Sequence, residues 1–450
     1  MPLRTYAIET WGCQMNVLDS EHLEGLLRAR GLSAVASAED ADVALLNTCS
    51  VREKAVQKVL SRLGELRRAR LAAGRPRIVG LCGCVAEQEK ERLFARSEVL
   101  DFVLGPGRLA HLPVALDQAE AGEHVCFTGF TAVREIDSHL TARPAGPRQF
   151  VTAVHGCSRH CSFCVVPFTR GHERSRPYDE IIAEVRHLAE TVRNCEVTLL
   201  GQTVNAYCCP VTGATFADLL TGVCNVEGLW RVQFLTSHPS FLTAELIETI
   251  ATAPRLGRYM HVPFQTGSNG VLRRMRRGYT REGYLERVSR LRHAAPHVTL
   301  STDVIVGFPG ESEEDFADTL ALVREVHFGQ LYGFAFSPRP RTPAARYGGR
   351  VPAAVAKERL ARLFELQGGI QLELNQALIG ARVEVLVDGP AKRGAGLWQG
   401  RGDDNRVVNF LAWKGIAPGD LATVTITGAT AHALIGETAR DWRGDSALQA

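Results

Sequence analysis

Residues 149–171 read QFVTAVHGCSRHCSFCVVPFTRG and place three cysteines in one short loop. The apolar opening of this stretch predicts a strand, which leads directly into Cys157, Cys161 and Cys164. Their C-x-x-x-C-x-x-C spacing is typical of metal ligands, and the glycine and proline in the loop oppose a continuous helix. A structural zinc ion or an ordinary iron–sulfur cluster takes four protein ligands. The loop therefore predicts either a fourth ligand elsewhere or a metal position that stays open.

Downstream of this loop, strand-like and helix-like segments alternate. Further strands are predicted at EVTLLGQ, WRVQFLTS, RYMHVPF, VTLSTDVIVGF and GQLYGFAF. Six strands with helices between them predict an open or partial (β/α)6 barrel over residues 149–378, with its functional side at the carboxyl ends of the strands. Polar or special residues follow the strands there, at Gly201-Gln202, Ser237-His238, Gln265, Asp303 and Ser337.

Residues 1–125 show the same alternation and predict a doubly wound parallel sheet. Cys13, Cys49 and Cys84 each follow a predicted strand and precede a predicted helix. Because such turns all emerge at the carboxyl edge of a parallel sheet, we expect the three thiols to share one site. Cys82 lies two residues before Cys84 and is the alternative, but Cys84 is favoured because it occupies the turn.

The sequence pattern changes in the C-terminal part of the chain. Residues 126–148 contain TARPAGPR and predict a linker, whereas residues 379–442 contain short period-two segments broken by Gly and Asp. The latter predict a small antiparallel β-barrel resembling an OB-like nucleic-acid module. Basic residues that could form a local patch on it are Lys392, Arg393, Arg401, Arg406 and Lys414. The arginine-rich run LRRMRRGYTREGY, residues 272–284, predicts either a solvated helix face or a track for phosphates.

Composition sets the wider bounds. The chain has 450 residues, of which 45% are hydrophobic and 22% charged, with a net charge of only +3 that says little about partners. The sequence contains no run of 18 or more apolar residues, so no membrane span is predicted. The opening residues do not resemble a signal peptide, and we therefore expect a cytoplasmic protein. Twelve cysteines in a reducing compartment favour metal or redox chemistry over disulfides.

A three-ligand loop has a specific chemical consequence. If three cysteines bind three irons of a 4Fe–4S cube, the fourth iron keeps an open position that an amine and a carboxylate could chelate. S-adenosylmethionine fits, because one electron into its sulfonium would break a carbon–sulfur bond and give a 5′-deoxyadenosyl radical. The alternative is a zinc site completed by His155, His160 or His172, as in a non-catalytic zinc protein that binds RNA.

Several ordered motifs resemble the radical-SAM methylthiotransferases over almost the whole chain. They are WGCQMN, NTCSVREKA, GCVAE, GCSRHCSFCVVPFTRGHERSRP, LGQTVNAY, FLTSHP, HVPFQTGS, STDVIVGFPGE and FSPRPRTPAA, and GRGDDNRVVNF resembles a TRAM domain. The residues after Cys49 resemble those of members that act on a dimethylallyl adenosine of tRNA. Members that modify a ribosomal-protein aspartate or threonylcarbamoyladenosine in tRNA carry different residues there. One small departure is Glu87, where a glutamine is more usual.

The resemblance implies two 4Fe–4S clusters and S-adenosylmethionine. Cys157, Cys161 and Cys164 would hold the radical SAM cluster, and Cys13, Cys49 and Cys84 an auxiliary cluster that supplies sulfur. The implied reaction is methylthiolation of carbon 2 of N(6)-dimethylallyladenosine at tRNA position 37, next to the anticodon. The implied partners are the tRNA anticodon stem-loop, a one-electron donor of flavodoxin or ferredoxin type, and a sulfur or cluster repair carrier. We expect a monomer.

Candidate contacts complete the prediction. S-adenosylmethionine contacts are expected among Arg170, Glu173, Arg176, Gln202, Asn205 and Asp303, although the arginines could only brace the cluster loop. RNA contacts are expected among Arg273, Arg274, Arg276, Arg277, Lys392, Arg393, Arg401 and Arg406.

Overall fold

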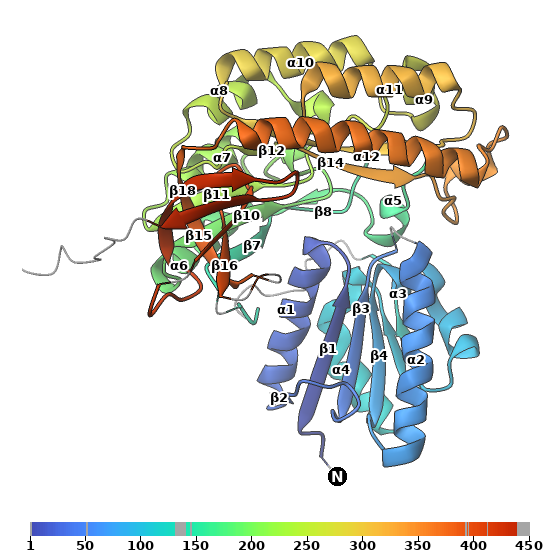
Figure 1. The fold of residues 1–450 in the computed structure, drawn as a ribbon. Helices are drawn as coiled ribbons and strands as arrows, with labels where there is room; N and C mark the ends of the chain where they lie inside the picture. The colour runs from blue at the N-terminus through green and yellow to red at the C-terminus, as the bar shows by residue number, and fades with distance from the viewer. Residues whose placement is uncertain are drawn as a thin grey trace, which may run out of the picture.

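The computed structural model describes residues 2–50, 53–130, 141–144, 146–391, 394, 396–411 and 413–438. Figure 1 shows three regions: an N-terminal α/β region, a central α/β region, and a small β-barrel packed beside the central region. No helix within the described ranges is long and apolar enough to cross a membrane.

The N-terminal region is a six-stranded, fully parallel sheet in the order β2-β1-β3-β4-β5-β6. Its strands are β1 (Thr5–Trp11), β2 (Ser33–Ala34), β3 (Val43–Thr48), β4 (Ile78–Gly83), β5 (Phe102–Leu104) and β6 (Val125–Phe127). Every residue of β3 and β4 is buried, as expected for strands covered on both faces. Because β6 belongs to this sheet, the region extends two residues past the expected limit at residue 125.

Helices cover both faces of that sheet. Leucines of α1 (Gln14–Ala29) and α4 (Leu112–Glu120) pack on one face. Apolar residues of α2 (Glu53–Ala73), α3 (Cys84–Glu89) and the short helix η1 (Lys90–Arg96) pack on the other. Another short helix, η2 (Pro106–His111), precedes α4. The predicted doubly wound arrangement is confirmed.

The central region contains the six predicted strands in two parallel three-stranded sheets. One is β7 (Arg148–Thr152), β10 (Cys195–Leu200) and β11 (Leu229–Phe234); the other is β12 (Tyr259–His261), β13 (Thr299–Val306) and β14 (Gln330–Ala335). A single bridge between Val232 and Leu256 joins them. This curved, open set of parallel strands confirms the partial barrel.

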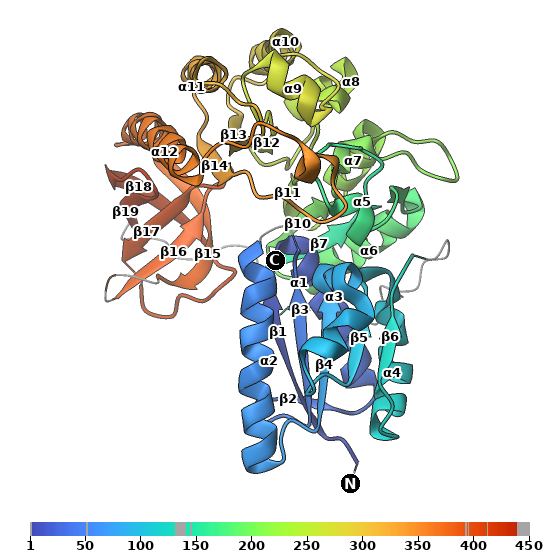
Figure 2. The same cartoon turned by 90° about the vertical axis from the view of Figure 1, so that its right-hand side faces the viewer.

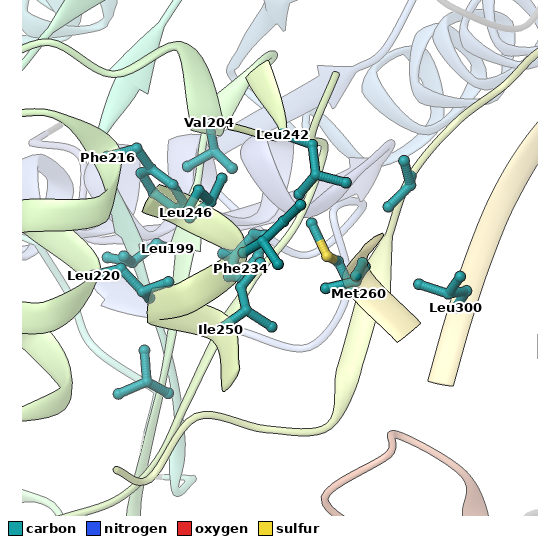
Figure 3. Close-up of a cluster of buried hydrophobic side chains, with 14 of the residues drawn as sticks. Leu199, Val204, Phe216, Leu220, Phe234, Leu242, Leu246, Ile250, Met260 and Leu300 are labelled. Carbon is teal, nitrogen blue, oxygen red and sulfur yellow. The ribbon is translucent and has the colours of Figure 1, made fainter. Parts of the chain in front are cut away.

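Helices surround these strands on the outside. They are α6 (Tyr178–Thr191), α7 (Phe216–Cys224), α8 (Ala244–Thr252), α9 (Asn269–Met275), α10 (Arg281–Ala294), α11 (Glu313–Val326) and α12 (Ala353–Gln376). Short elements complete the region: β8 (Val154–His155), α5 (Val166–Thr169), β9 (Arg174–Ser175), η4 (Val204–Ala206), η5 (Pro239–Phe241) and η6 (Pro343–Arg346). Figure 3 shows part of the large apolar core between strands and helices, including Phe216, Phe234 and Met260. This core fixes the strand ends on which the site depends.

The C-terminal region is a closed five-stranded barrel in the order β15-β16-β17-β19-β18. Its strands are β15 (Arg382–Pro390), β16 (Leu397–Arg401), β17 (Val407–Leu411), β18 (Leu421–Ala429) and β19 (Leu434–Thr438). One detail differs from the prediction, because β17 and β19 pair in parallel whereas the other pairs are antiparallel. Five strands in a closed ring cannot alternate in direction at every pair, so closure of the barrel requires one parallel pair.

The N-terminal sheet points its carboxyl edge at the central region, as both views show (Figures 1 and 2). Met15 and Leu18 of α1 form a small apolar cluster with Leu200 at the end of β10. Helix α3 also packs against α5, the short helix that follows the triple-cysteine loop. The strand ends of the two regions therefore face each other.

Candidate active site

Three strand ends bring the N-terminal cysteines together. Trp11 lies opposite Thr48, and Thr48 lies opposite Gly83, so β1, β3 and β4 end at the same level. Cys49 donates its backbone N–H to the Trp11 carbonyl at 2.9 Å, which keeps the turns adjacent. We call Cys13, Cys49 and Cys84 the N-terminal triad.

Glycine at position 83 makes the third turn possible. Its φ of +90° is left-handed, and a Cβ there would lie 2.4 Å from the Asn47 side-chain oxygen. The chain can therefore pass directly from β4 into α3 with Cys84 as the first helical residue. Cys82 instead packs within the apolar core on the α1 face of the sheet. The structure thus places Cys84, and not Cys82, in the triad.

The triad thiols are in mutual contact. The Cys49 thiol hydrogen-bonds with Cys13 and Cys84, and these contacts raise the pKa of Cys49. The same contacts lower the pKa of Cys13 to about 6 and that of Cys84 to about 7, against the opposing effect of burial, with further help from the Arg170 guanidinium. Cys13 is exposed whereas Cys49 and Cys84 are buried, so the triad opens on the Cys13 side. The lowered pKa values favour the thiolate, the form that binds metal, at Cys13 and Cys84.

Two buried asparagines behind the triad were not identified from the sequence. Asn16 donates to the Asn47 side chain at 3.2 Å, and Asn47 donates to the Asn16 carbonyl and the Ser20 hydroxyl, each at 2.8 Å. The Asn16 oxygen also accepts from the Cys13 backbone N–H at 3.4 Å. This network fixes the first two turns relative to each other. Its sequence signal is an asparagine near a cysteine in both WGCQMN and NTCS.

The second cysteine group, Cys157, Cys161 and Cys164, occupies the loop between β8 and α5 and is called the central triad. Its loop is closed by the Cys157 N–H, which donates to the Gly171 carbonyl at 3.0 Å. The Cys157 thiol contacts the Thr203 hydroxyl at 3.4 Å. Burial raises the pKa of Cys157 and raises that of Cys164 to about 12. Burial therefore favours the protonated thiol at Cys157 and Cys164 until a metal displaces the proton.

One buried arginine serves the central triad. Arg277 donates to the Cys161 sulfur at 3.3 Å, to the Pro263 carbonyl at 3.2 Å and to the Tyr279 hydroxyl at 3.1 Å. Within the described chain it makes no ion pair with a carboxylate. It was predicted as an RNA contact, and its burial against Cys161 corrects that prediction.

A cavity of about 190 Å³ lies against the central triad, with all three cysteines in its wall. Gln202 also lines it, and both polar atoms of its amide are buried with no partner among the residues that the structure describes. Unpartnered buried amides are costly, so this side chain is positioned for a polar ligand. Gln202, predicted from its place at a strand end, therefore lies in the cavity beside the cysteines.

A second cavity of about 600 Å³ contains Cys13 and Cys49 in its wall. Thr236, His261 and Asp303 line both cavities, so the two triads open toward a shared wall. His261 contacts the Ser301 hydroxyl through Nδ1 at 2.8 Å and the Asp303 carboxylate through Nε2 at 3.3 Å. Asp303, also predicted as a ligand contact, thus stands between the two sites.

Four other predicted ligand contacts do not line the central cavity in the described part of the chain. Arg170 extends into the N-terminal region, where it donates to Asp19 at 2.6 Å, both side chains being buried. Arg176 donates to the Thr152 carbonyl at 3.0 Å and pairs with a glutamate of α6 at 2.6 Å. In the described structure both arginines thus brace the loop and the domain boundary, which was the alternative role given to them from the sequence.

The remaining two also have internal partners. Asn205 accepts from the His238 N–H at 2.8 Å and donates to the His238 carbonyl at 3.0 Å, so its amide holds a neighbouring strand end. The Glu173 backbone N–H donates to the Ser158 hydroxyl at 3.1 Å. Both residues shape the loops around the central triad.

The predicted RNA residues separate into distinct groups. Arg273, Arg274 and Arg276 are exposed on or just after α9, and Arg274 donates to the Gly310 carbonyl at 2.6 Å. Arg406 instead donates to Asn375 of α12 at 2.9 Å, and Arg401 donates to Asn405. Arg406 thus joins the barrel to the central region, whereas Arg401 braces the barrel internally. Lys392 and Arg393 lie outside the described residues.

The donor sets fit iron–sulfur cubes. A cube takes each thiolate on a different iron, and each triad supplies three thiols and one open side. Over the described residues, no three His, Cys, Asp or Glu side chains form a ligand set for a single metal ion. The zinc alternative required a histidine as fourth ligand, yet His155, His160 and His172 are not among the residues that line the central cavity. That alternative gains no support from the geometry.

Comparison with known proteins identifies the class. The model described as Radical SAM superfamily matches residues 151–323, and that described as Uncharacterized protein family UPF0004 matches residues 5–105. A solved structure of the radical S-adenosylmethionine methyltransferase TsrM from Kitasatospora setae, with cobalamin and a [4Fe-4S] cluster bound, has a TM-score of 0.53 at 14% identity. That match covers 88% of this chain and 81% of the other. The fold is therefore that of a radical SAM protein.

Curated relatives then identify the family. The tRNA-2-methylthio-N(6)-dimethylallyladenosine synthase of Alkalilimnicola ehrlichii is 43% identical over 96% of this chain and 96% of its own length. That of Geobacter sulfurreducens is 45% identical over 98% of each chain. This chain belongs to the tRNA-2-methylthio-N(6)-dimethylallyladenosine synthase family, which confirms the resemblance found in its motifs.

Proposed function

We propose that this protein attaches a methylthio group to carbon 2 of N(6)-dimethylallyladenosine at tRNA position 37. The observation that carries the proposal is the shared wall between the two cysteine triads. Thr236, His261 and Asp303 line both the cavity at the central triad and the cavity at Cys13 and Cys49. A base placed at this wall is within reach of both sites at once. The relatives' names support the same reaction.

The chemistry requires cofactors that no side chain can replace. The carbon 2 hydrogen of adenine is too weakly acidic for a general base, so a radical is needed. The central triad would hold one 4Fe–4S cluster and the N-terminal triad the other. When bound, they supply the electron that cleaves S-adenosylmethionine and the sulfur that is transferred.

The chain's own residues then bind, orient and shield. We propose that Gln202 and Asp303 bind polar groups of S-adenosylmethionine, because Gln202 presents an unpartnered amide and Asp303 borders both cavities. Arg277 would orient the Cys161 side chain and place a positive charge beside that side of the cluster. Burial of Cys157 and Cys161 keeps water away from the reactive site.

Further parts of the proposal concern partners and location. We propose that the C-terminal barrel and the exposed arginines Arg273 and Arg276 contact the anticodon stem-loop. A cytoplasmic monomer would receive electrons from a flavodoxin- or ferredoxin-type donor and sulfur from a repair carrier. With the limits of β6 and β7 taken into account, the domains are proposed as residues 1–127, 148–378 and 379–442, with a linker at 128–147. Arg→Ala changes on α9 would test the RNA contact through the salt slope of binding.

The decisive experiment is anaerobic reconstitution with iron and sulfide, followed by reaction with an anticodon stem-loop that carries N(6)-dimethylallyladenosine. Mass analysis of the digested nucleosides should show the 2-methylthio derivative together with 5′-deoxyadenosine. Product only on threonylcarbamoyladenosine RNA or on a ribosomal-protein aspartate would move the protein to one of those substrates. Two zinc ions per chain, with no iron or sulfide, would overturn the radical proposal altogether.

A further inference from the structure

The larger cavity, at Cys13 and Cys49, has an unusually aromatic wall. It is lined by Trp11 at the end of β1 and by Tyr332 and Phe334 of β14, and Tyr259 and Leu235 add further apolar surface. We call this set the aromatic pocket. Its volume of about 600 Å³ compares with about 190 Å³ at the central triad, so the two cavities suit ligands of different size.

The strand pattern explains why two aromatic side chains enter the pocket from β14. Side chains alternate along a strand, and Gly333 faces outward, where an added Cβ would lie 2.9 Å from Leu360 and 3.0 Å from Phe364 of α12. Tyr332 and Phe334 therefore point to the opposite side. Tyr332 makes an edge contact with His261, with ring centroids 6.0 Å apart, which connects the aromatic pocket to the shared wall.

The charges around the pocket are arranged asymmetrically. Asp303 stands at the inner wall, next to the central cavity. Lys58 stands at Trp11, with its ammonium 4.9 Å from the ring centroid, and is exposed. An electron-poor purine with a neutral alkyl substituent suits the apolar interior, and a backbone phosphate suits the exposed ammonium. A substituent carrying a carboxylate would instead meet Asp303 on the inner side.

We propose that the aromatic pocket binds the purine and its five-carbon N6 substituent, and that Tyr332 and Phe334 determine the preference for an alkenyl group. This inference rests on the proposed function and adds to it a specificity determinant. Stacking on aromatic rings is a general way to hold an unstacked base, and apolar contact with the alkyl chain supplies the discrimination. The carbon 2 side of the base is then left toward His261 and Asp303, at the wall shared with the central cavity.

The test measures binding rather than turnover. Fluorescence anisotropy of the anaerobically reconstituted protein is recorded with three anticodon stem-loops, which differ only in carrying adenosine, N(6)-dimethylallyladenosine or threonylcarbamoyladenosine. We expect the dimethylallyl loop to bind at least about tenfold more tightly than the other two. Phe334→Ala and Tyr332→Ala should each weaken the dimethylallyl loop by about tenfold and the unmodified loop by much less.

Two further variants make the result specific. Phe334→Leu keeps an apolar side chain and should retain most of the alkenyl preference, which also covers the case in which the alanine variant folds poorly. Phe364→Ala removes an aromatic ring of α12 that packs on the outer side of β14. This variant should bind all three loops as the unaltered protein does.

The inference is overturned if the variants weaken the three loops equally, or if the threonylcarbamoyl loop binds most tightly. Failure of the proposed function has a different signature. In that case the loaded protein cleaves S-adenosylmethionine yet forms no methylthio product, whatever the order of the three affinities.

Discussion

The two cysteine triads solve the same ligation problem by opposite means. The central triad lies within one loop, between Cys157 and Cys164, and its geometry is set by short-range contacts such as that between Cys157 and Gly171. The N-terminal triad is gathered from three strand ends that are far apart in the chain. The first is therefore a property of local sequence, whereas the second exists only when the whole parallel sheet has formed.

Their electrostatic settings differ as well. Contacts among the N-terminal thiols lower the pKa of Cys13 and Cys84, and the nearby Arg170 is paired with Asp19. In the central triad, burial raises the pKa of Cys157 and Cys164, and Arg277 lacks a carboxylate partner among the described residues. An unneutralised arginine places more positive charge on the central site. That charge favours uptake of an electron there rather than at the N-terminal site.

The largest effect should come from removing one thiol from each triad. Cys157→Ala should stop cleavage of S-adenosylmethionine, because the cluster that contacts it loses a ligand. Cys49→Ala should leave cleavage in place but reduce methylthio product to background, because only the second site is damaged. Chromatographic measurement of 5′-deoxyadenosine and of the modified nucleoside separates the two outcomes.

Cys208→Ala is the matched control, since Cys208 is an exposed cysteine outside both triads. It should leave both products unchanged. Full methylthio product from the Cys49→Ala protein would show that the N-terminal triad is not needed for the reaction, and the functional comparison of the two triads would then be wrong.

The next effect concerns the arginine that crosses between the regions. Breaking the buried Arg170–Asp19 pair by Arg170→Met leaves an unpaired carboxylate and should cost about 3–5 kcal/mol. The double variant Arg170→Met with Asp19→Leu should recover much of that loss. Chemical denaturation of the metal-free proteins gives the free energies, and the change in the double variant minus the sum of the changes in Arg170→Met and Asp19→Leu alone measures the coupling.

The exposed pair between Arg67 and Glu98 provides the comparison for this measurement, since both side chains are more than half exposed. Arg67→Met should cost no more than about 1 kcal/mol. An equally small loss for Arg170→Met would mean that the Arg170–Asp19 pair contributes little to holding the two regions together.

A smaller effect should appear in the reduction potential of the central cluster. Arg277→Met removes a charged donor to the Cys161 sulfur, so the reduced cluster loses stabilisation. A charged hydrogen bond contributes about 1.5–3 kcal/mol, which corresponds to roughly 60–130 mV for one electron, toward more negative potential. Titration monitored by electron paramagnetic resonance should show this shift at the central cluster only.

Arg277→Lys should restore part of the potential, because it keeps the charge. Arg274→Met is the matched control, since Arg274 lies nearby on α9 but is exposed. If the Arg277→Met protein kept the unaltered potential, Arg277 would have a purely structural role.

The same comparison shows what sequence can and cannot predict. The grouping of Cys13, Cys49 and Cys84 was predictable because parallel strands end at one edge, and the six central strands were predictable from their periodicity. Arg170 was assigned to the central cavity because it follows the cysteine loop, but α5 ends there and turns its side chain into the neighbouring region. Only tertiary structure determines that direction.

Arg277 illustrates the same limit at a helix end. Within the run of residues 272–284 it looks like one of several surface arginines. Arg276 adopts a left-handed conformation with φ of 57° as the C-cap of α9, and the chain then turns so that Arg277 points inward. Local composition predicts the number of arginines on this segment, whereas the helix termination decides which one is buried. The parallel pairing of β17 with β19 was missed for a related reason, since period-two patterns carry no strand direction.

The smallest predicted effect tests how pH affects the contact between the two regions. Glu21 of α1 lies near Arg143 and Glu184 at that contact, and burial, opposed by Arg143 and assisted by Glu24 and Glu184, raises its pKa to about 7. Because its pKa is higher in the folded state, the folded protein binds more protons between about pH 4.5 and 7. Its stability should therefore fall as pH rises through this window, by on the order of 1–3 kcal/mol.

Glu21→Gln should remove this pH dependence, because the amide has no proton to lose. The variant should match the unaltered metal-free protein at pH 5 and unfold at a temperature a few degrees higher at pH 8, since about 1 kcal/mol shifts Tm by roughly 2–4 °C in a domain of this size. Glu98→Gln, at an exposed carboxylate of the same region, should leave the pH dependence intact. An unchanged slope in the Glu21→Gln protein would place the titrating group elsewhere.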